Sequence, residues 1–350
     1  MTIIFAILLF SLLIFVHELG HFVAAKLSGV QVNEFAMFMG PAIVKWQRGE
    51  TLYSIRCIPI GGYCAMEGED EDTGNPRSFQ KAAWWKRLII LVAGSAMNFV
   101  IGILLMAIIT APAKSIPVPV IHQVEQGCTI VGEGGLQQGD RILEVDGEKI
   151  YVAGDFSMIL TLNGGDVHDL VVERNGEKVR LNDFKMEKHL FGDEESPRYG
   201  FSFGYEEATF GNKVKYAWNS SLNVVRTVRL SLKMLVTGQA GLKDMSGPVG
   251  IVQIMSDTAE ASETRLDALM NMLYFGAFIA INLAVMNMLP IPALAGGRVF
   301  GLLVTTAIEA ITRKKVNPKY EGYIHAAGMI LLLILMAVIM FKDIFFIFKR

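Results

Sequence analysis

Four long apolar runs divide this chain. They cover Ile3–Leu27, Leu88–Ala111, Ala268–Leu289 and Tyr323–Phe341, and the second has 24 residues without a charge. About 20 apolar helical residues cross the hydrocarbon core of a bilayer. The pattern therefore predicts a polytopic α-helical membrane protein with four transmembrane helices.

A secretory signal peptide is the alternative for the first run. A signal peptide has a basic start and a small-residue cleavage site after its apolar region. Neither is present here, and His17, Glu18 and His21 lie where that region would end. A membrane span is therefore the favoured interpretation.

Composition agrees with a membrane protein. Hydrophobic residues make up 52% of the 350 residues, charged residues 19%, and the net charge is −2. Soluble domains carry roughly 25% charged residues. The balance also excludes a basic nucleic-acid-binding surface and intrinsic disorder.

Basic residues predict the orientation of the spans. Residues 1–16 contain no Lys or Arg, residues 28–87 contain seven and residues 291–322 contain five. Cytoplasmic loops carry the excess of Lys and Arg. Both termini and the insert between spans two and three should then lie outside the cytoplasm, although Lys349 and Arg350 argue mildly against this for the C-terminus.

The insert looks like a folded domain. Short β-like runs alternate with turn signals, and Asn175-Gly176 is typical of a two-residue hairpin. The predicted strands are Val118–Val124, Arg141–Val145, Leu170–Glu173 and Val179–Leu181, and the predicted helix is Ala153–Leu162. The expected organisation is 1–111 (spans one and two with the loop 28–87), 112–205 (folded insert), 206–266 (amphipathic helical linker) and 267–350 (spans three and four).

An amphipathic stretch covers residues 212–238 of the linker. Apolar and basic residues alternate there at helical spacing. Such a helix either lies in the membrane interface or packs on the insert, and the sequence leaves both possibilities open.

The chemistry-bearing motif is His17-Glu18-Leu19-Gly20-His21, within the first span. Histidines at i and i+4 lie on one helical face and can both reach one Zn²⁺ ion. Glu18 can then act as the general base that takes a proton from water. A polar cluster buried for packing is the alternative, but ionisable groups inside a span are costly and indicate function.

The depth of this motif follows from helix geometry. His17 lies 14 residues after Ile3, roughly 21 Å along a helix, inside a core about 30 Å thick. Water must reach it through a cavity from the cytoplasmic side. Catalytic zinc sites use three protein ligands, so a third should come from another span, and the Pro- and Gly-rich stretch Asn287–Arg298 ends the third.

These motifs together resemble the bacterial site-2 proteases, most closely the regulator-of-sigma-E protease group of intramembrane zinc metalloproteases. The matching segments are HELGH at 17–21, NMLPIPALAGG at 287–297, GSAMN at 94–98, GGY at 61–63, SGPVGI at 246–251 and GLQQGDRIL at 135–143. The last resembles a PDZ domain, so the resemblance implies one extracytoplasmic PDZ-like domain over 112–205. It also implies one Zn²⁺ ion held by His17 and His21.

Position 295 departs from the family pattern. The resemblance implies an Asp there as the third zinc ligand, and this chain has Ala295. Everything around it is intact, so a single, engineered, inactivating replacement is the favoured interpretation. A natural pseudoprotease and a different third ligand remain open.

The resemblance further implies a membrane-spanning substrate, such as an anti-sigma factor already trimmed by a site-1-type protease, or a signal-peptide remnant. Residues 51–60 followed by Gly61, Gly62 and Tyr63 are expected to form a β-hairpin that enters the membrane and adds the substrate as a strand; an ordinary cytoplasmic hairpin is the alternative. Asn287, with Pro290 and Pro292 at the helix break, is expected to hold the unwound substrate; the alternative for Asn287 is that it caps the third span. The competing function classes are a non-catalytic membrane adaptor and a metal transporter.

Overall fold

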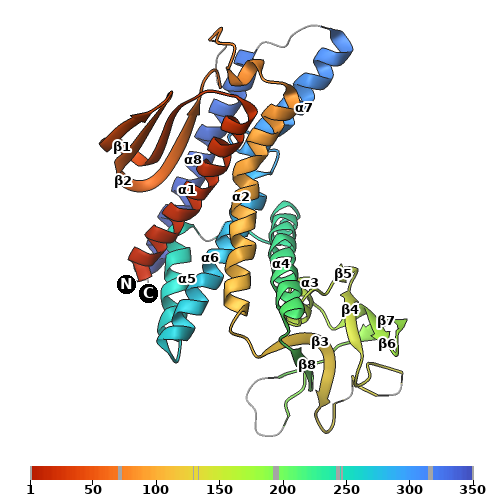
Figure 1. Cartoon of the computed structure of the whole chain (residues 1–350). Coiled ribbons are helices and arrows are strands. Elements are labelled where there is room, and N and C mark those ends of the chain that lie inside the picture. The colour runs from red at the N-terminus through yellow and green to blue at the C-terminus, as the bar shows by residue number, and fades with distance from the viewer. Residues whose placement is uncertain are drawn as a thin grey trace. The chain divides into compact units, whose positions relative to one another are not determined.

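The computed structural model describes residues 2–69, 73–128, 130–132, 134–191, 197–241, 245, 247–313 and 318–348. The chain forms two compact units. The first combines Met1–Leu105 with Thr227–Arg350, and the second is Met106–Arg226. Figure 1 labels the elements of both.

Helices dominate the first unit. Five of the described helices are long and apolar enough to cross a membrane. Its helices are α1 (Thr2–Ser28), the 3₁₀ turn Phe79–Lys81, α2 (Trp84–Thr110, which ends in the second unit), α5 (Pro248–Glu260), α6 (Arg265–Asn287), α7 (Ala295–Thr312) and α8 (Pro318–Phe348). The four predicted spans correspond to α1, α2, α6 and α8.

The sequence analysis missed α7 as a fifth candidate. It treated residues 291–322 as a cytoplasmic loop, whereas Ala295–Thr312 is helical with a mean hydropathy of 1.2. The apolar residues between Arg298 and Glu309 form less than three turns, so the run was too short to be recognised as a span. The prediction of four spans is therefore corrected to five candidate helices.

The outer faces of these helices are apolar. Leu8, Ile89 and Leu331 are 62%, 51% and 68% exposed. Burial of such side chains stabilises a soluble protein by about 1.5–3 kcal/mol each, and here they remain uncovered by protein. A lipid environment accounts for this arrangement.

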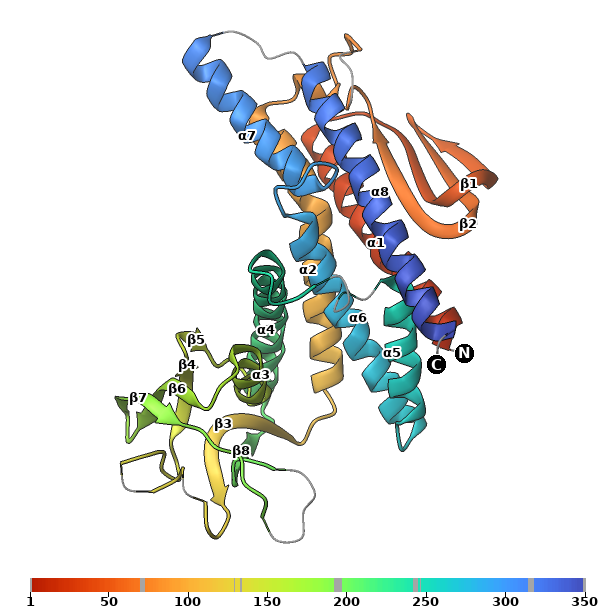
Figure 2. The ribbon, with the colours of Figure 1, turned by 180° about the vertical axis from the view of Figure 1, so that it is seen from behind.

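The start of α1 and the end of α8 lie side by side in both views of the ribbon (Figures 1 and 2). Both elements belong to the first unit. Helix α1 therefore begins at the same end of this helical unit where α8 ends.

Two bent strands, β1 (Val32–Arg48) and β2 (Thr51–Met66), form a sheet beside α1. Residues of β1 have partners in both halves of β2: Phe35 lies opposite Cys64 and also opposite Tyr53. The first half of β1 therefore lies between the two halves of β2. The predicted hairpin at 51–63 is part of this larger sheet.

This sheet runs along α1 as far as the middle of the helix. The Ser11 hydroxyl donates a hydrogen bond of 3.0 Å to the carbonyl of Pro59. Aromatic rings fill the interface, with Phe22 and Phe35 at 4.9 Å between centroids. The sheet is thus fixed against the helix that carries the HExxH motif.

The second unit is the folded insert. Its sheet has the order β7-β6-β4-β3-β8, with β5 paired to β4. The elements are β3 (Ser115–Val124), β4 (Arg141–Val145), β5 (Glu148–Lys149), α3 (Gly154–Asn163), β6 (Val167–Arg174), β7 (Glu177–Lys185) and β8 (Phe201–Glu207). All four predicted strands and the predicted helix are confirmed, with ends that differ by at most four residues. The predicted hairpin turn joins β6 to β7, and Asn175 and Gly176 have positive φ there.

Helix α4 (Phe210–Val236) corresponds to the predicted amphipathic stretch. Arg226 on this helix is 5% exposed and forms a 2.8 Å ion pair with Asp155, which is fully buried at the start of α3. Asp155 also accepts from the backbone N–H of Tyr151 at 2.6 Å. Packing on the insert is therefore confirmed for this part of α4.

A buried carboxylate links α8 to the segment that follows α4. Asp343 is 7% exposed and accepts hydrogen bonds from the backbone N–H groups of Gly247, at 2.8 Å, and Gly250, at 3.1 Å. These N–H groups belong to the first turn of α5, which lacks helical partners. A side chain distant in sequence thus caps α5.

Removing this carboxylate should loosen the start of α5. We expect Asp343→Ala to lower the free energy of unfolding by about 1–2 kcal/mol, as the loss of a capping acceptor does, and to speed amide hydrogen exchange at residues 247–250. Asp343→Asn keeps an acceptor oxygen and is the control. Equal exchange rates in the two variants would contradict the capping role.

Candidate active site

Helix α1 presents His17 and His21 one turn apart on the same face. Their Nε2 atoms are 3.2 Å apart and their ring centroids 4.8 Å apart. Two nitrogen ligands at 2.0–2.1 Å from a tetrahedral Zn²⁺ ion lie roughly 3.3 Å from each other. The two imidazoles therefore fit one zinc ion.

Helix α2 closes over these imidazoles. A β-carbon at Gly94 would lie 2.4 Å from Nε2 of His21 and 2.8 Å from Nε2 of His17, and one at Gly20 would lie 2.5 Å from the carbonyl of Ala93. Small residues let membrane helices approach this closely. The absence of a side chain at Gly94 thus leaves space for the rings, and its absence at Gly20 lets the two helices approach.

A cavity of ≈ 760 Å³ opens beside the histidines. Glu18 lines it, and its Cγ would lie 3.6 Å from a β-carbon at Gly62, so β2 covers this carboxylate closely. The walls come from α1, the end of β2, the turn after α6 and the start of α7. They include His17, Glu18, His21, Tyr63, Cys64, Ala65, Met66, Asn287, Ala295 and Arg298.

The segment between α6 and α7 forms a tight turn at the wall of this cavity. A β-carbon at Gly296 would lie 2.3 Å from the backbone of Met288, so only glycine fits there. Ala293 has a φ of 79°, and its N–H donates to Nδ1 of His325 on α8 at 3.0 Å. The turn thereby places Ala295, the first residue of α7, in the same cavity as the histidines.

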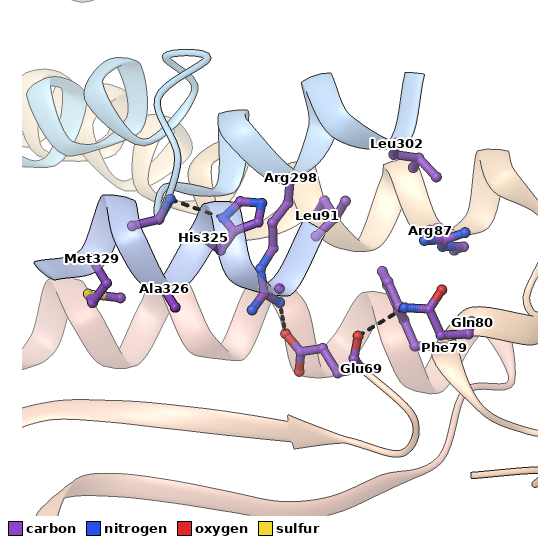
Figure 3. Close-up of a pocket in the computed structure, with 12 residues that line it drawn as sticks. Glu69, Phe79, Gln80, Arg87, Leu91, Arg298, Leu302, His325, Ala326 and Met329 are labelled. Atoms are coloured by element: carbon purple, nitrogen blue, oxygen red, sulfur yellow. Dashed lines mark hydrogen bonds and ion pairs between the residues drawn. The ribbon is translucent and has the colours of Figure 1, made fainter. Parts of the chain in front are cut away.

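A second cavity of ≈ 390 Å³ adjoins the first and shares five lining residues with it. Figure 3 shows this cavity, with the ion pair between Arg298 and Glu69 and the hydrogen bond to His325. Gln80 donates to the carbonyl of Glu69 at 3.1 Å. Arg298 and Glu69 therefore join the start of α7 to the loop that follows β2, directly beside the site.

The metal fit is incomplete at one position. His17 and His21 supply two nitrogen ligands, whereas the methyl group of Ala295 cannot coordinate a metal. In the part of the chain that the structure describes, no third His, Cys, Asp or Glu joins them as a metal-binding group. The described residues therefore provide two of the three protein ligands that a catalytic zinc site uses.

Comparison with known proteins identifies the family. Residues 5–335 match the sequence model of Peptidase family M50. The chain belongs to this family.

Curated relatives align over nearly the whole chain. A protein of Clostridium acetobutylicum named "Putative zinc metalloprotease" is 38% identical over 348 residues, covering 98% of this chain and 97% of the relative. One of the same name from Clostridium perfringens is 36% identical, covering 99% of each. The "Regulator of sigma-W protease RasP" of Bacillus subtilis is 27% identical, covering 98% of each. M50 membership implies a membrane zinc metalloprotease.

Six of the predicted site residues of this M50 chain line the larger cavity, and four lie outside its lining. His17, Glu18, His21, Tyr63, Asn287 and Ala295 all line the larger cavity. Gly62 lies over Glu18, and Gly61 contacts Met39 within the sheet. Pro290 is exposed, and Pro292 packs against Gly328 of α8. The substrate-binding roles of all these residues remain predictions.

Some residues around this M50 site were not identified from the sequence. Ile90, Arg298 and His325 contact it through a carbonyl, an ion pair and a ring nitrogen. A backbone carbonyl has no sequence signal. Arg298 was counted among the cytoplasmic charges and ended the stretch Asn287–Arg298, and no role in the site was predicted for it. Asn98, whose amide lies 3.4 Å from Nδ1 of His17, was noted only as part of a matching motif. A polar amide within an apolar span was the signal that could have marked it as a site residue.

The gap at Gly94 provides a first test of the site. In a chain carrying Ala295→Asp, we expect Gly94→Ala to weaken zinc affinity about tenfold or more, because the added methyl group occupies the space of both imidazoles. Zinc binding is measured by competition with a chelating dye. Ser95→Ala, next in the helix, is the control and should bind zinc normally. Unchanged affinity in Gly94→Ala would refute the arrangement of α1 and α2.

Proposed function

We propose that this chain has the architecture of an intramembrane zinc endopeptidase of the site-2 type, an enzyme that cleaves transmembrane segments of membrane proteins. The observation that carries the proposal is the convergence of His17, Glu18, His21 and position 295 in one cavity walled by candidate membrane helices. A metal transporter is disfavoured because such a protein has no use for a general base beside a sheet edge.

Each residue of the motif has a distinct role in this proposal. His17 and His21 would hold the zinc ion, which would supply Lewis-acid chemistry at the scissile carbonyl. Glu18 accepts the proton of the attacking water and passes it to the leaving amine. Asn287, at the end of α6 and on the cavity wall, donates its amide to the unwound substrate backbone.

The sheet provides a place for the substrate strand. Within the described chain, residues 62–66 pair only with the first half of β1, so their other edge is unpaired. Tyr63, Cys64, Ala65 and Met66 line the catalytic cavity. A helical substrate has its backbone bonds satisfied internally and must unwind before hydrolysis. Addition to this edge, with Gly61 and Gly62 allowing close approach, holds it extended.

The contact between the sheet and α1 supports a sheet that enters the membrane. The carbonyl of Pro59 accepts a hydrogen bond from the hydroxyl of Ser11, which lies in the middle of α1 and far from its predicted cytoplasmic end. We propose a bacterial cytoplasmic-membrane protein whose termini and insert face outward. The adjacent ends of α1 and α8 support termini on one side, which requires an even number of crossings. In both views α7 continues from the end of α6 in the same direction, so in this proposal α6 and α7 together make one crossing and the five candidate helices make four.

The name of one relative supports a substrate class. It is called "Regulator of sigma-W protease RasP", and we propose as substrate an anti-sigma factor, first trimmed by a site-1-type protease, or a signal-peptide remnant. We further propose that Ala295 inactivates this chain. A non-catalytic membrane adaptor is the second candidate, and the absence of a third ligand at position 295 favours it.

Restoring the ligand tests the proposal. We expect Ala295→Asp to raise zinc affinity by at least tenfold, because three ligands replace two, and to produce proteolysis of a transmembrane reporter. The new carboxylate lies in the first turn of α7, where the helix dipole favours it by about 0.3–1 kcal/mol. The measurements are metal content and cleavage in detergent or liposomes.

Matched variants separate the possible outcomes. Ala295→Asn introduces a side chain with the shape of Asp but without its charge, and it should restore little activity. Glu18→Gln combined with Ala295→Asp should bind zinc but cleave nothing. An Ala295→Asp chain that binds zinc and never cleaves would favour the adaptor, and full proteolysis by the unmodified chain would refute the inactivation.

The PDZ-like insert has two candidate roles, recognition of a substrate C-terminus and exclusion of substrates with bulky outer domains. Its ends lie together, since the N–H of Ala208 donates to the carbonyl of Lys114 at 3.3 Å. Residues 115–207 can therefore be replaced by a short Gly-Ser linker in the Ala295→Asp chain. Loss of cleavage of a trimmed substrate indicates recognition, and cleavage of an untrimmed substrate indicates exclusion.

A further inference from the structure

Helix α2 presents three residues to the histidine pair at intervals of four. Ile90, Gly94 and Asn98 lie two turns apart in total and therefore on one face. The carbonyl of Ile90 lies 2.7 Å from Nδ1 of His21, and the amide of Asn98 lies 3.4 Å from Nδ1 of His17. Each imidazole thus meets a polar group of α2 at Nδ1, the nitrogen that faces away from the Nε2 pair. The backbone of Gly94 is a further hydrogen-bond partner of His17.

The contact to Ile90 fixes the tautomer of His21. A carbonyl can only accept, so Nδ1 of His21 carries the proton and donates it. Its Nε2 is then left with a lone pair that can bind a metal. Metal-binding histidines usually have such a partner, which also fixes the orientation of the ring.

The contact to Asn98 has the same consequence in one orientation of its amide. Oxygen and nitrogen of an Asn amide are assigned from their hydrogen bonds, not seen directly. With Nδ2 toward His17, Nδ1 would have to accept, and the proton would lie on Nε2, where it blocks the metal. With Oδ1 toward His17, Nδ1 donates and Nε2 is free.

The metal-binding role of His17 requires the second orientation. Asn98 is 1% exposed, and its Oδ1 atom is buried with no hydrogen-bond partner in the arrangement described. Turning the amide gives this oxygen the Nδ1–H of His17 as its donor and moves Nδ2 to the position that the oxygen leaves. Only this orientation leaves Nε2 of His17 with a lone pair for a metal.

We propose that Asn98 is a positioning residue of the active site: its Oδ1 accepts from Nδ1 of His17 and so holds this imidazole in the metal-binding tautomer, as the carbonyl of Ile90 does for His21. The inference rests on the proposed metal-binding role of the two histidines. It adds a side-chain requirement on α2 to a site otherwise built from α1 and α7.

The test compares acceptor-bearing and acceptor-free side chains in the full-length Ala295→Asp chain. We expect Asn98→Leu, of similar shape, to weaken Zn²⁺ and Co²⁺ affinity about 10- to 100-fold and to alter the absorption spectrum of bound Co²⁺. Asn98→Asp keeps the acceptor and should restore both. Asn98→Ala is a second acceptor-free variant, and Ser95→Ala is the control on the same helix.

The readouts distinguish this inference from the function on which it rests. Tight Co²⁺ binding with an unchanged spectrum in Asn98→Leu or Asn98→Ala would overturn the role of Asn98. His17→Ala and His21→Ala should each abolish metal binding. If they bind metal normally, the zinc site itself is refuted, whatever Asn98 does.

Discussion

The contact between α1 and α2 is the constraint on which the site depends. Two imidazoles must fit between helices whose surroundings are apolar, and polar groups buried without partners are costly. Gly94 leaves the space for the rings, and the carbonyl of Ile90 satisfies one of them. A larger residue at position 94 would separate the helices or displace both rings at once.

The elements around this contact complete a cavity from distant parts of the chain. The sheet is held to α1 by the bond from Ser11 to Pro59, and its free edge lies along the cavity. The turn before α7 is held by His325 and by the packing of Pro292 on Gly328. Both α7 and α8 therefore depend on the same turn, which explains why its glycines and prolines occur together.

The sequence was sufficient for the features that depend on local pattern. The four apolar runs, the strands of the insert and the HExxH helix follow from periodicity and turn residues, and the structure confirms them. Features that depend on tertiary contact were missed. The double pairing of β1 needs a bend that no local pattern specifies, and α7 contains too many polar residues to be recognised as a span. Asp343 caps α5 from almost a hundred residues away.

The support that α2 gives to the histidine pair contrasts with position 295. A methyl group at position 94 would meet both imidazoles, and the buried amide of Asn98 lies beside His17 although an apolar side chain would suit a membrane helix better. The backbone carbonyl of Ile90 would be available whatever side chain stood there. On the opposite wall of the cavity Ala295 brings no metal-binding atom, so the two walls differ in how well they suit a metal ion.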